Sequence, residues 1–253
     1  MIPKTIHYCW FGRNPKPKLA EKCIRSWKKY CPDYEIIEWN EDNFNLSTAP
    51  LYVRQAYEAK KWAFVTDYVR LKLVYDYGGI YMDTDVELLK NLDFLLPNYA
   101  YFGFEYSSFV NTGLGFGAVK GLPILKEMMD DYEDIPFVLP GGDYDETMCI
   151  HRNFNVFLRH GLIQKDTRQI LEEGILILPS TYLCPKAYND LRRKKAKETI
   201  SIHWYAASWL TKEQVKLDRD SYRKDYIMHL PNRMLRKVLG YECYERLKKR
   251  LKK

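Results

Sequence analysis

Short apolar runs alternate with helix-forming stretches in the first third of the chain, and this order limits the chain to few folds. The runs at residues 2–10, Glu35–Trp39 and 80–82 predict strands. Between them, residues 19–30 and 51–77 carry apolar side chains at helical spacing. A strand–helix–strand–helix–strand order is typical of α/β proteins whose sheet is at least partly parallel. We therefore predict an α/β fold with a mixed, mostly parallel sheet flanked by helices.

The rest of the chain continues this pattern and then changes character. Further strands are predicted at residues 99–104, 113–119, 175–178 and 199–203, and helices at residues 123–131 and 145–160. From about Leu210 the pattern is helical and charged to the end, with no internal repeat before it. We predict one domain over residues 1–215, followed by a basic helical extension over residues 216–253.

Composition limits the class of protein and its compartment. The 253 residues are 46% hydrophobic and 29% charged, which suits one sizeable globular domain. The six cysteines form no CxxC pair, as expected of reduced thiols in a cytoplasm. The first twelve residues contain no apolar run of signal-peptide length, and no segment reaches eighteen apolar residues. We therefore expect a cytoplasmic protein that does not span a membrane.

Two aspartates follow the third predicted strand, in the sequence GGIYMDTD at residues 78–85. Gly78 and Gly79 supply the left-handed conformation that ends a helix. Because side chains two apart on a strand share a face, we expect Asp83 and Asp85 to project together at its carboxyl end, where ligands bind in open α/β sheets. Two such carboxylates suit a hard divalent cation that shares its oxygen ligands with substrate phosphates. A solvated turn, or a helix N-cap at Asp85, is the plainer alternative.

An acid and a base precede these aspartates on the predicted helix. Asp67 and Arg70 lie three residues apart and are therefore neighbours on the helix surface. A surface ion pair with little consequence is one interpretation. Because the helix runs directly into the strand that carries Asp83, the pair is also expected near the same site.

Three segments together resemble a glycosyltransferase family with a DXD sugar-binding region. This family includes yeast initiating mannosyltransferases and bacterial capsule-polysaccharide transferases, and is similar to the catalytic domain of the large clostridial glucosylating toxins. IHYCWFG near the N-terminus resembles the family's first strand, and HWYAASW at residues 203–209 resembles its closing loop. The matching positions of the DXD region are Ala63, Asp67, Arg70, Leu73, Gly78, Gly79, Tyr81, Asp83 and Asp85.

The resemblance implies a GT-A-type nucleotide-sugar-binding fold and a metal site. Asp83 would contact the ribose and the metal, partly through water, and Asp85 would bind the metal directly. His203 would be the metal ligand from the closing loop. A neutral imidazole beside carboxylates suits Mn²⁺ better than the alternative, Mg²⁺.

The resemblance also implies donor-binding and catalytic roles, with a UDP-sugar as the expected donor. Trp10 would stack on uracil, Asp67 would bind sugar or ribose hydroxyls, and Arg70 would bind the donor sugar or diphosphate. The other implied donor contacts are Tyr81, Asn111, Ser208 and Trp209, the last two lying over the diphosphate and glycosidic oxygen. The catalytic set is Asp83, Asp85, Arg70 and Trp209. For Trp10 and His203, the alternatives are a core residue and a strand histidine with satisfied hydrogen bonds.

We therefore expect a metal-dependent retaining glycosyltransferase that passes a sugar to a saccharide acceptor in bacterial capsular or other surface polysaccharide synthesis. The metal would neutralise charge on the departing diphosphate, and Arg70 with the closing loop would add to this. Retention is implied by the resemblance alone. Because no residue stands out as a covalent nucleophile, front-side attack by the acceptor hydroxyl is preferred. The segment LPGGDYDETM (139–148) lacks a motif common in the family, which leaves the acceptor open.

Two other classes of protein share parts of this pattern. A DxD-type metal-dependent phosphohydrolase also places two acids after an apolar strand, but has Thr or Val where this chain has Glu87. A basic nucleic-acid-binding protein would fit the net charge of +7. However, the basic residues cluster in the tail, so we expect no nucleic-acid partner.

The tail at residues 233–253, RMLRKVLGYECYERLKKRLKK, has apolar residues at three- and four-residue spacing among many cations. Such a helix can lie in an anionic membrane interface, or it can pack on the domain with solvated lysines. Capsule-type acceptors are commonly lipid-linked at the inner leaflet. We therefore expect the extension to bind an anionic membrane surface, with the protein peripherally associated with the inner face of the plasma membrane.

Overall fold

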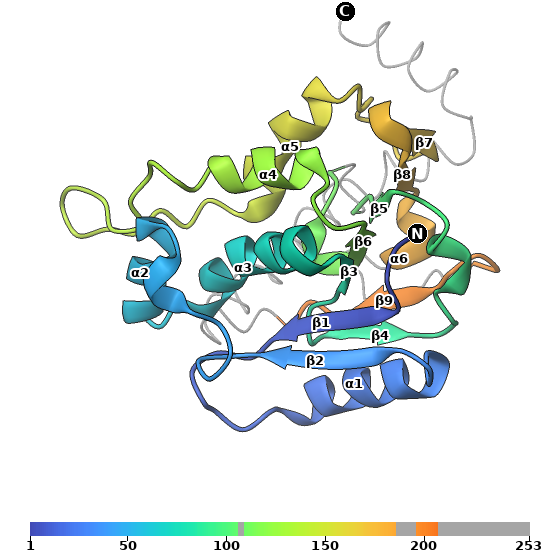
Figure 1. Cartoon of the computed structure of the whole chain (residues 1–253), viewed down its shortest axis with the longest axis horizontal. Helices are drawn as coiled ribbons and strands as arrows, with labels where there is room; N and C mark the ends of the chain where they lie inside the picture. The colour runs from blue at the N-terminus through green and yellow to red at the C-terminus, as the bar shows by residue number, and fades with distance from the viewer. Residues whose placement is uncertain (106–108, 186–195, 207–253) are drawn as a thin grey trace, which may run out of the picture. The chain divides into compact units, whose positions relative to one another are not determined.

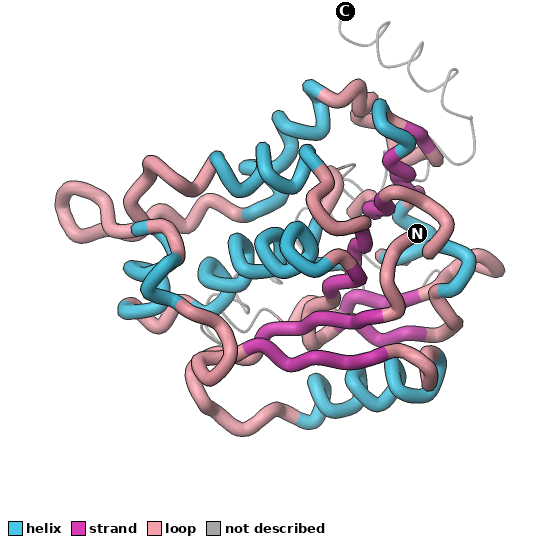
Figure 2. Tube along the Cα trace, in the orientation of Figure 1, coloured by secondary structure: helices cyan, strands magenta, loops and turns pink. Residues whose placement is uncertain are grey.

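A seven-stranded sheet forms the centre of the described part of the chain (Figures 1 and 2). The computed structural model describes residues 1–105, 109–185 and 196–206, all within the first of the chain's two units, Met1–Trp209. The strand order is β2-β1-β3-β6-β5-β8-β7. The strands of this sheet are β1 (Thr5–Cys9), β2 (Glu35–Trp39), β3 (Gly79–Tyr81), β5 (Ala100–Gly103), β6 (Phe116–Ala118), β7 (Gln169–Ile170) and β8 (Ile175–Leu178).

Most strands of this sheet run in one direction. β1 is parallel to both β2 and β3, and β5 is parallel to β8. β6 runs antiparallel to β3 and β5, and β7 runs antiparallel to β8. Thus β2, β1, β3, β5 and β8 point the same way, and only β6 and β7 are reversed. The predicted α/β fold with a mixed, mostly parallel sheet is confirmed.

Helices cover both faces of the sheet because successive strand residues alternate between two cores. On β1, Ile6 belongs to one core and Cys9 to the other, and on β5 Tyr101 and Phe102 divide in the same way. One core lies against α2, α3, α4 and α5, and the other against α1 and α6 (Figure 1). The helices are α1 (Lys18–Tyr30), α2 (Leu51–Glu58), α3 (Trp62–Tyr77), α4 (Pro123–Asp130), α5 (Cys149–Arg159) and α6 (Ser180–Leu183).

Helix boundaries follow local backbone chemistry. Residues 51–77, predicted as one or two helices, form the two helices α2 and α3, which are separated at Lys60 by its left-handed φ of +57°. Gly78 then ends α3 with a φ of +70°, as predicted. The predicted helix over residues 145–160 begins only at Cys149. Asp145 accepts a hydrogen bond from the Thr147 hydroxyl (2.6 Å), which favours a turn over a helix there.

A separate two-stranded ribbon brings distant parts of the sequence together. β4 (Val86–Leu88) follows directly after the two aspartates and pairs antiparallel with β9 (Ser201–His203). In this register Val86 lies opposite His203. The strand at β9 was predicted, but β4 and its pairing were not, because three residues show no periodicity.

The five co-directed strands of the sheet end at one edge, and the predicted site residues follow them. Trp10 follows β1 and Asp83 follows β3. Glu105 follows β5 by the same geometry. β1 is the strand at which the chain changes direction across the sheet, since β2 lies on one side of it and β3 on the other. Ligands bind outside the carboxyl ends of strands at such switch points.

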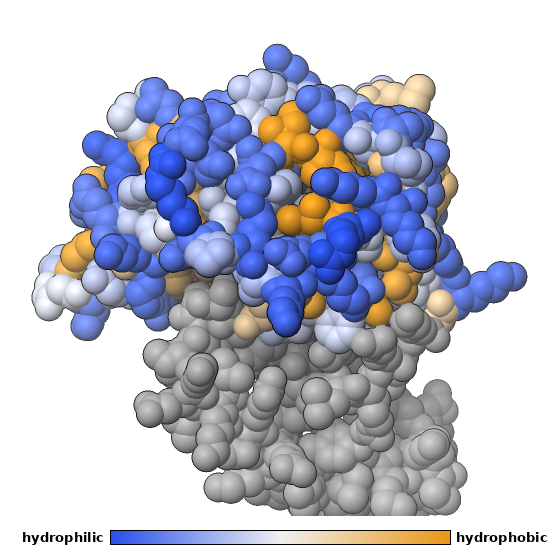
Figure 3. All heavy atoms as spheres, turned by 90° about the horizontal axis from the view of Figure 1, so that it is seen from below, coloured by the Kyte–Doolittle hydropathy of each residue, from blue (hydrophilic) through white to orange (hydrophobic). Residues whose placement is uncertain are grey.

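The helices of the described residues bear on whether the chain crosses a membrane. None of the helices in the described residues combines the length and the apolar composition that crossing a membrane requires. The face in Figure 3 is largely hydrophilic, with apolar patches of limited size. Ser208, Trp209, the predicted boundary at residue 215 and the tail at residues 233–253 lie outside the described residues.

Candidate metal centre

Asp83 and Asp85 lie in a turn rather than on a strand face. β3 ends at Tyr81, and the Val86 N–H donates to the Asp83 carbonyl (3.0 Å), closing a turn between β3 and β4. The expectation that a shared strand face aligns the two side chains is therefore wrong in its geometry. Their carboxylates nevertheless lie close together, with one oxygen of each within 4.8 Å of the other.

His203 is the third member of the cluster. One ligand atom from each of Asp83, Asp85 and His203 lies within 4.8 Å of the other two. The β4–β9 register places His203 beside Asp85, and its Nε2 is 3.2 Å from Asp85 Oδ1. The tertiary pairing of two three-residue strands thus brings the imidazole to the acids.

The segment after β9 wraps around Asp85. The Trp204 N–H donates to the Asp85 carbonyl (3.0 Å), and the Ala206 N–H donates to Asp85 Oδ2 (2.7 Å). Tyr205 between them has a φ of +51°, an uncommon value for an aromatic residue. This strained conformation turns the chain back toward Asp85, and such strain clusters at functional sites. Sequence reasoning identified the segment as a closing loop but not these backbone contacts.

Burial and charge act on the three groups together. Burial alone lowers the pKa of His203, but Asp85 and Asp83 outweigh it and raise that pKa above its usual value near 6.5. Burial opposes ionisation of Asp85 too, yet His203 and the Ala206 N–H hold its pKa below the usual value. Burial raises the pKa of Asp83, against the attraction of Arg70. The carboxylate oxygens of Asp83 and Asp85 therefore favour a bound cation between them.

Arg70 and Tyr81 form a buried layer behind Asp83. The Tyr81 hydroxyl donates to Asp83 Oδ1 (3.0 Å), and Arg70 Nη2 lies 3.3 Å from the same oxygen. Arg70 Nη2 is also 3.0 Å from Asp67 Oδ1, and Arg70 Nη1 donates to Cys149 Sγ (3.8 Å). The Arg70 side chain is 5% exposed and that of Asp83 25%. Asp83 therefore reaches solvent, whereas Arg70 holds two acids from behind.

Asn111 is held by hydrogen bonds within the protein. Its Oδ1 accepts from the Gly113 N–H (2.6 Å) and its Nδ2 donates to Glu105 Oε2 (2.7 Å). Glu105 adds to the field that raises the pKa of His203. Sequence reasoning did not identify Glu105, because a single acid after a strand carries no pattern.

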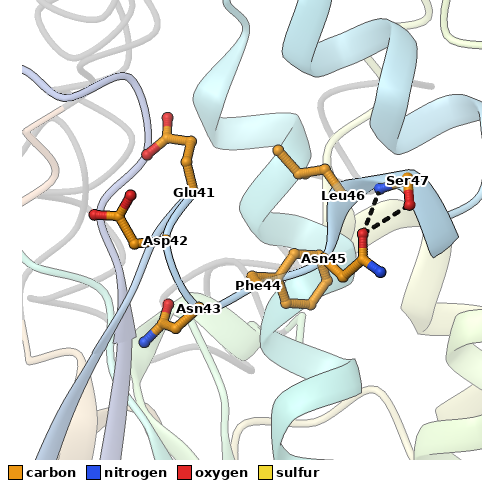
Figure 4. Close-up of a pocket in the computed structure, with 7 residues that line it drawn as sticks. All are labelled: Glu41, Asp42, Asn43, Phe44, Asn45, Leu46 and Ser47. Atoms are coloured by element: carbon orange, nitrogen blue, oxygen red, sulfur yellow. Dashed lines mark hydrogen bonds between the residues drawn. The ribbon is translucent and has the colours of Figure 1, made fainter.

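Trp10 lies at the same edge of the sheet and is only partly buried. Its Nε1 donates to the Asn14 carbonyl (2.6 Å), and the Lys16 ammonium lies 5.7 Å from the ring centre. The partly buried ring also packs against the core on the α1 side of the sheet. A hollow of about 410 Å³ lies on the neighbouring loop after β2 (Figure 4). This loop is tied to the Trp10 segment by the Gly12 N–H, which donates to Glu41 Oε1 (2.6 Å). The residues that line the hollow are Glu41, Asp42, Asn43, Phe44, Asn45, Leu46 and Ser47.

The cluster fits a divalent transition metal. Two carboxylates and an imidazole are a donor set that Mn²⁺ accepts. The His203 nitrogen that faces Asp85 is Nε2, and one ligand atom of Asp83 lies within 4.8 Å of the other two residues' ligand atoms. Two acids this close together are better satisfied with a cation bound between them than without one.

Comparison with known proteins agrees with this geometry over part of the chain. Residues 17–102 match the family model described as glycosyltransferase sugar-binding region containing DXD motif. The resemblance drawn from the sequence is thereby confirmed for residues 17–102. This range includes Asp67, Arg70, Asp83 and Asp85, but not Trp10, Asn111 or His203. The implied roles of all these residues stay predictions.

Individual relatives support the same class. Inositol phosphoceramide mannosyltransferase 3 of Schizosaccharomyces pombe (strain 972 / ATCC 24843) is 31% identical over 132 residues, which cover 51% of this chain and 36% of the relative. The chain spans less than two fifths of the length of the two curated relatives it matches.

Two solved structures are also similar. PaToxG glycosyltransferase matches with a TM-score of 0.44 and 23% identity, over 51% of this chain and 58% of that one. A glycosyltransferase involved in the glycosylation of the major capsid of PBCV-1 matches with a TM-score of 0.44 and 16% identity, over 84% of this chain and 97% of that one.

Proposed function

We propose that this protein is a metal-dependent glycosyltransferase that moves a sugar from a nucleotide donor to a saccharide acceptor. One observation carries the proposal: Asp83, Asp85 and His203 meet at the carboxyl edge of the sheet, next to a DXD sugar-binding region. The acids come from the matched region and the histidine from a distant strand. A donor diphosphate needs such a cation-binding corner beside the sheet.

The site residues divide into metal-holding and supporting groups. Asp85 and His203 would hold Mn²⁺, with Asp83 completing the set. The metal would supply Lewis-acid neutralisation of the departing diphosphate. Arg70 and Tyr81 fix Asp83 from the buried side, and the Ala206 N–H fixes Asp85. The contacts of Arg70 favour an orienting role over direct binding of the donor.

We expect the nucleotide base to lie on Trp10, beside the hollow of the neighbouring loop. Trp10→Ala should weaken UDP binding by roughly 1–3 kcal/mol, the range for base–aromatic stacks. Isothermal titration calorimetry with UDP and Mn²⁺ measures this. Tyr99→Ala is the matched control, because Tyr99 is 63% exposed and lies at the opposite, amino end of β5. An unchanged UDP affinity in a folded Trp10→Ala variant would remove Trp10 from the donor site.

A lipid-linked saccharide is the acceptor we propose. The curated relatives are named for inositol phosphoceramide, a lipid with a sugar-like headgroup, and the basic tail suits an anionic membrane. Synthesis of a bacterial capsular or other surface polysaccharide at the inner face of the plasma membrane would supply such an acceptor. The segment at residues 139–148 falls where the family resemblance places acceptor recognition.

If the tail binds the membrane, its removal should abolish liposome binding and leave donor hydrolysis unchanged. The full chain should co-sediment with liposomes rich in anionic lipid, and a chain ending at Pro231 should not, while donor hydrolysis is unchanged. Each nearby cation contributes about 1 kcal/mol to such binding. Neutral liposomes are the control. Equal sedimentation of the two chains, or of neither, would show that the tail has no role at the membrane.

A donor screen tests the proposed function itself. The protein with Mn²⁺ is incubated with a panel of nucleotide sugars that includes UDP-glucose, UDP-galactose and GDP-mannose, and the release of free nucleotide is measured. We expect slow hydrolysis of one UDP-sugar, abolished by EDTA. Hydrolysis of p-nitrophenyl phosphate with no turnover of any nucleotide sugar would instead support a phosphohydrolase.

A further inference from the structure

Gly113 packs directly against the carboxylate of Asp83. It lies in a short 3₁₀ turn, η3 (Thr112–Leu114), between β5 and β6. A methyl group on Gly113 would come closer than 3.0 Å to Asp83 Oδ2, a separation that real Cβ atoms essentially never show. The same methyl group would lie 3.1 Å from Arg70 Nη1 and 3.1 Å from Asn111 Oδ1. The space of a side chain at residue 113 is therefore filled by the aspartate.

Residue 113 is a glycine because a side chain would not fit beside Asp83, and not because its backbone conformation requires one. Gly113 is not among the residues with positive φ, whereas Gly115, two residues later, has a φ of +102°. An alanine could therefore adopt the backbone of residue 113 without strain. Any effect of a side chain at this position must come from its contacts with Asp83 and the neighbours of Asp83.

Neither partner in this contact is free to move away. The Gly113 N–H donates to Asn111 Oδ1 (2.6 Å), and the Asn111 N–H donates to the Gly103 carbonyl at the end of β5 (3.1 Å). On the other side, Tyr81 and Arg70 hold Asp83 Oδ1 at 3.0 and 3.3 Å. The turn is fixed to the sheet, and Asp83 is fixed to the buried layer behind it.

We propose that Gly113 is a positioning residue for the metal site. Its missing side chain lets Asp83 keep the orientation that brings its carboxylate to Asp85 and His203. This inference rests on the proposed metal-dependent function, and it adds a determinant of metal affinity from outside the DXD region. A side chain at residue 113 would rotate Asp83 away from the other two ligands or push the Asn111 turn off β5.

Manganese binding provides the first test, because it requires no substrate. Gly113→Ala should bind Mn²⁺ about 10- to 100-fold more weakly than the wild type, the range seen when groups that orient metal ligands are lost. Gly117→Ala is the matched control. Its methyl group would come within 2.7 Å of Tyr101 Cε1 and 3.0 Å of Ile80 Cγ1 in the core, and its third nearest atom would be the Gly79 carbonyl oxygen at 3.3 Å. The control should lower the melting temperature and leave Mn²⁺ affinity unchanged.

The outcomes separate this inference from the proposed function. Failure of the wild type to bind Mn²⁺, with UDP present, would overturn the metal-dependent function. If the wild type binds and Gly113→Ala binds equally well, only the positioning role is overturned. Equal losses in Gly113→Ala and Gly117→Ala would assign the effect to general destabilisation and would also overturn that role.

A double-mutant cycle measured in EDTA tests the contact without any metal. Gly113→Ala should lower the melting temperature of the wild type, but should cause little further loss in an Asp83→Ala background, where the occupied space is vacated. Gly117→Ala should lower the melting temperature by the same amount in the wild type and in Asp83→Ala. If Gly113→Ala alone does not fold, the double variant should fold. Equal costs of Gly113→Ala in the two backgrounds would contradict the packing argument.

Discussion

Asp85→Asn is expected to abolish Mn²⁺-dependent turnover of the nucleotide sugar. Asp85 is the acid that contacts His203, at 3.2 Å, and the segment after β9, through the Ala206 N–H at 2.7 Å. Asparagine keeps the shape of the side chain but removes the charge that holds the metal. Lewis-acid stabilisation is worth several kcal/mol, so we expect turnover to fall by about three orders of magnitude.

A control substitution shows whether the effect is specific to the charge at Asp85 or follows from removing the charge of an aspartate elsewhere. Asp76 forms an ion pair with Lys72 on α3 (2.6 Å) and lies outside the cluster. Asp76→Asn should therefore turn over the donor at the wild-type rate. Donor hydrolysis by Asp85→Asn at a rate near that of the wild type, with the protein folded, would refute the metal site.

Arg70→Met is expected to lower the free energy of unfolding more than the substitution of any exposed residue. Its guanidinium lies 3.0 Å from Asp67 and 3.3 Å from Asp83, and the side chain is 5% exposed. The pKa of Arg70 is raised well above its usual value because the two acids outweigh the effect of burial, so the group stays charged. Removing it leaves two carboxylates without their cation. Breaking a buried ion pair in this way costs about 3–5 kcal/mol.

Chemical denaturation of Arg70→Met, Arg70→Lys and Arg13→Met distinguishes charge from geometry. Arg70→Lys keeps the charge but loses the planar fork, so its stability should lie between those of the wild type and Arg70→Met. Arg13 pairs with Asp42 with both side chains about two-thirds exposed, and Arg13→Met should leave the unfolding free energy nearly unchanged. A stable, active Arg70→Met would show that Asp83 does not depend on Arg70.

The sequence predicts the fold well where local chemistry decides it. β2 and β8 begin and end where their apolar runs do, and Gly78 ends α3 in the left-handed conformation. The beginning of α5 is different, because Asp145 bonds to Thr147 and holds the preceding residues in a turn. Such side-chain competition with the helix depends on geometry that spacing does not contain.

The candidate site was predicted in its parts but not in its arrangement. The two aspartates are visible as a motif, yet they converge through a turn and not through a strand face. His203 was found only through resemblance, since its place beside Asp85 depends on the pairing of β4 with β9. No pattern in the sequence points to Gly113 or Glu105 as site residues. Their roles come from the packing of a loop against residues far away in the sequence, which no local pattern records.

A titration of the protein with Mn²⁺, followed by the electron paramagnetic resonance signal of the free ion, tests the central claim most directly. We predict that the wild type binds one Mn²⁺ per chain, that binding strengthens when UDP is added, and that His203→Ala and Asp85→Asn both lose it. Retention of the same Mn²⁺ affinity by both variants, or no binding by the wild type with UDP present, would contradict a metal centre formed by Asp83, Asp85 and His203.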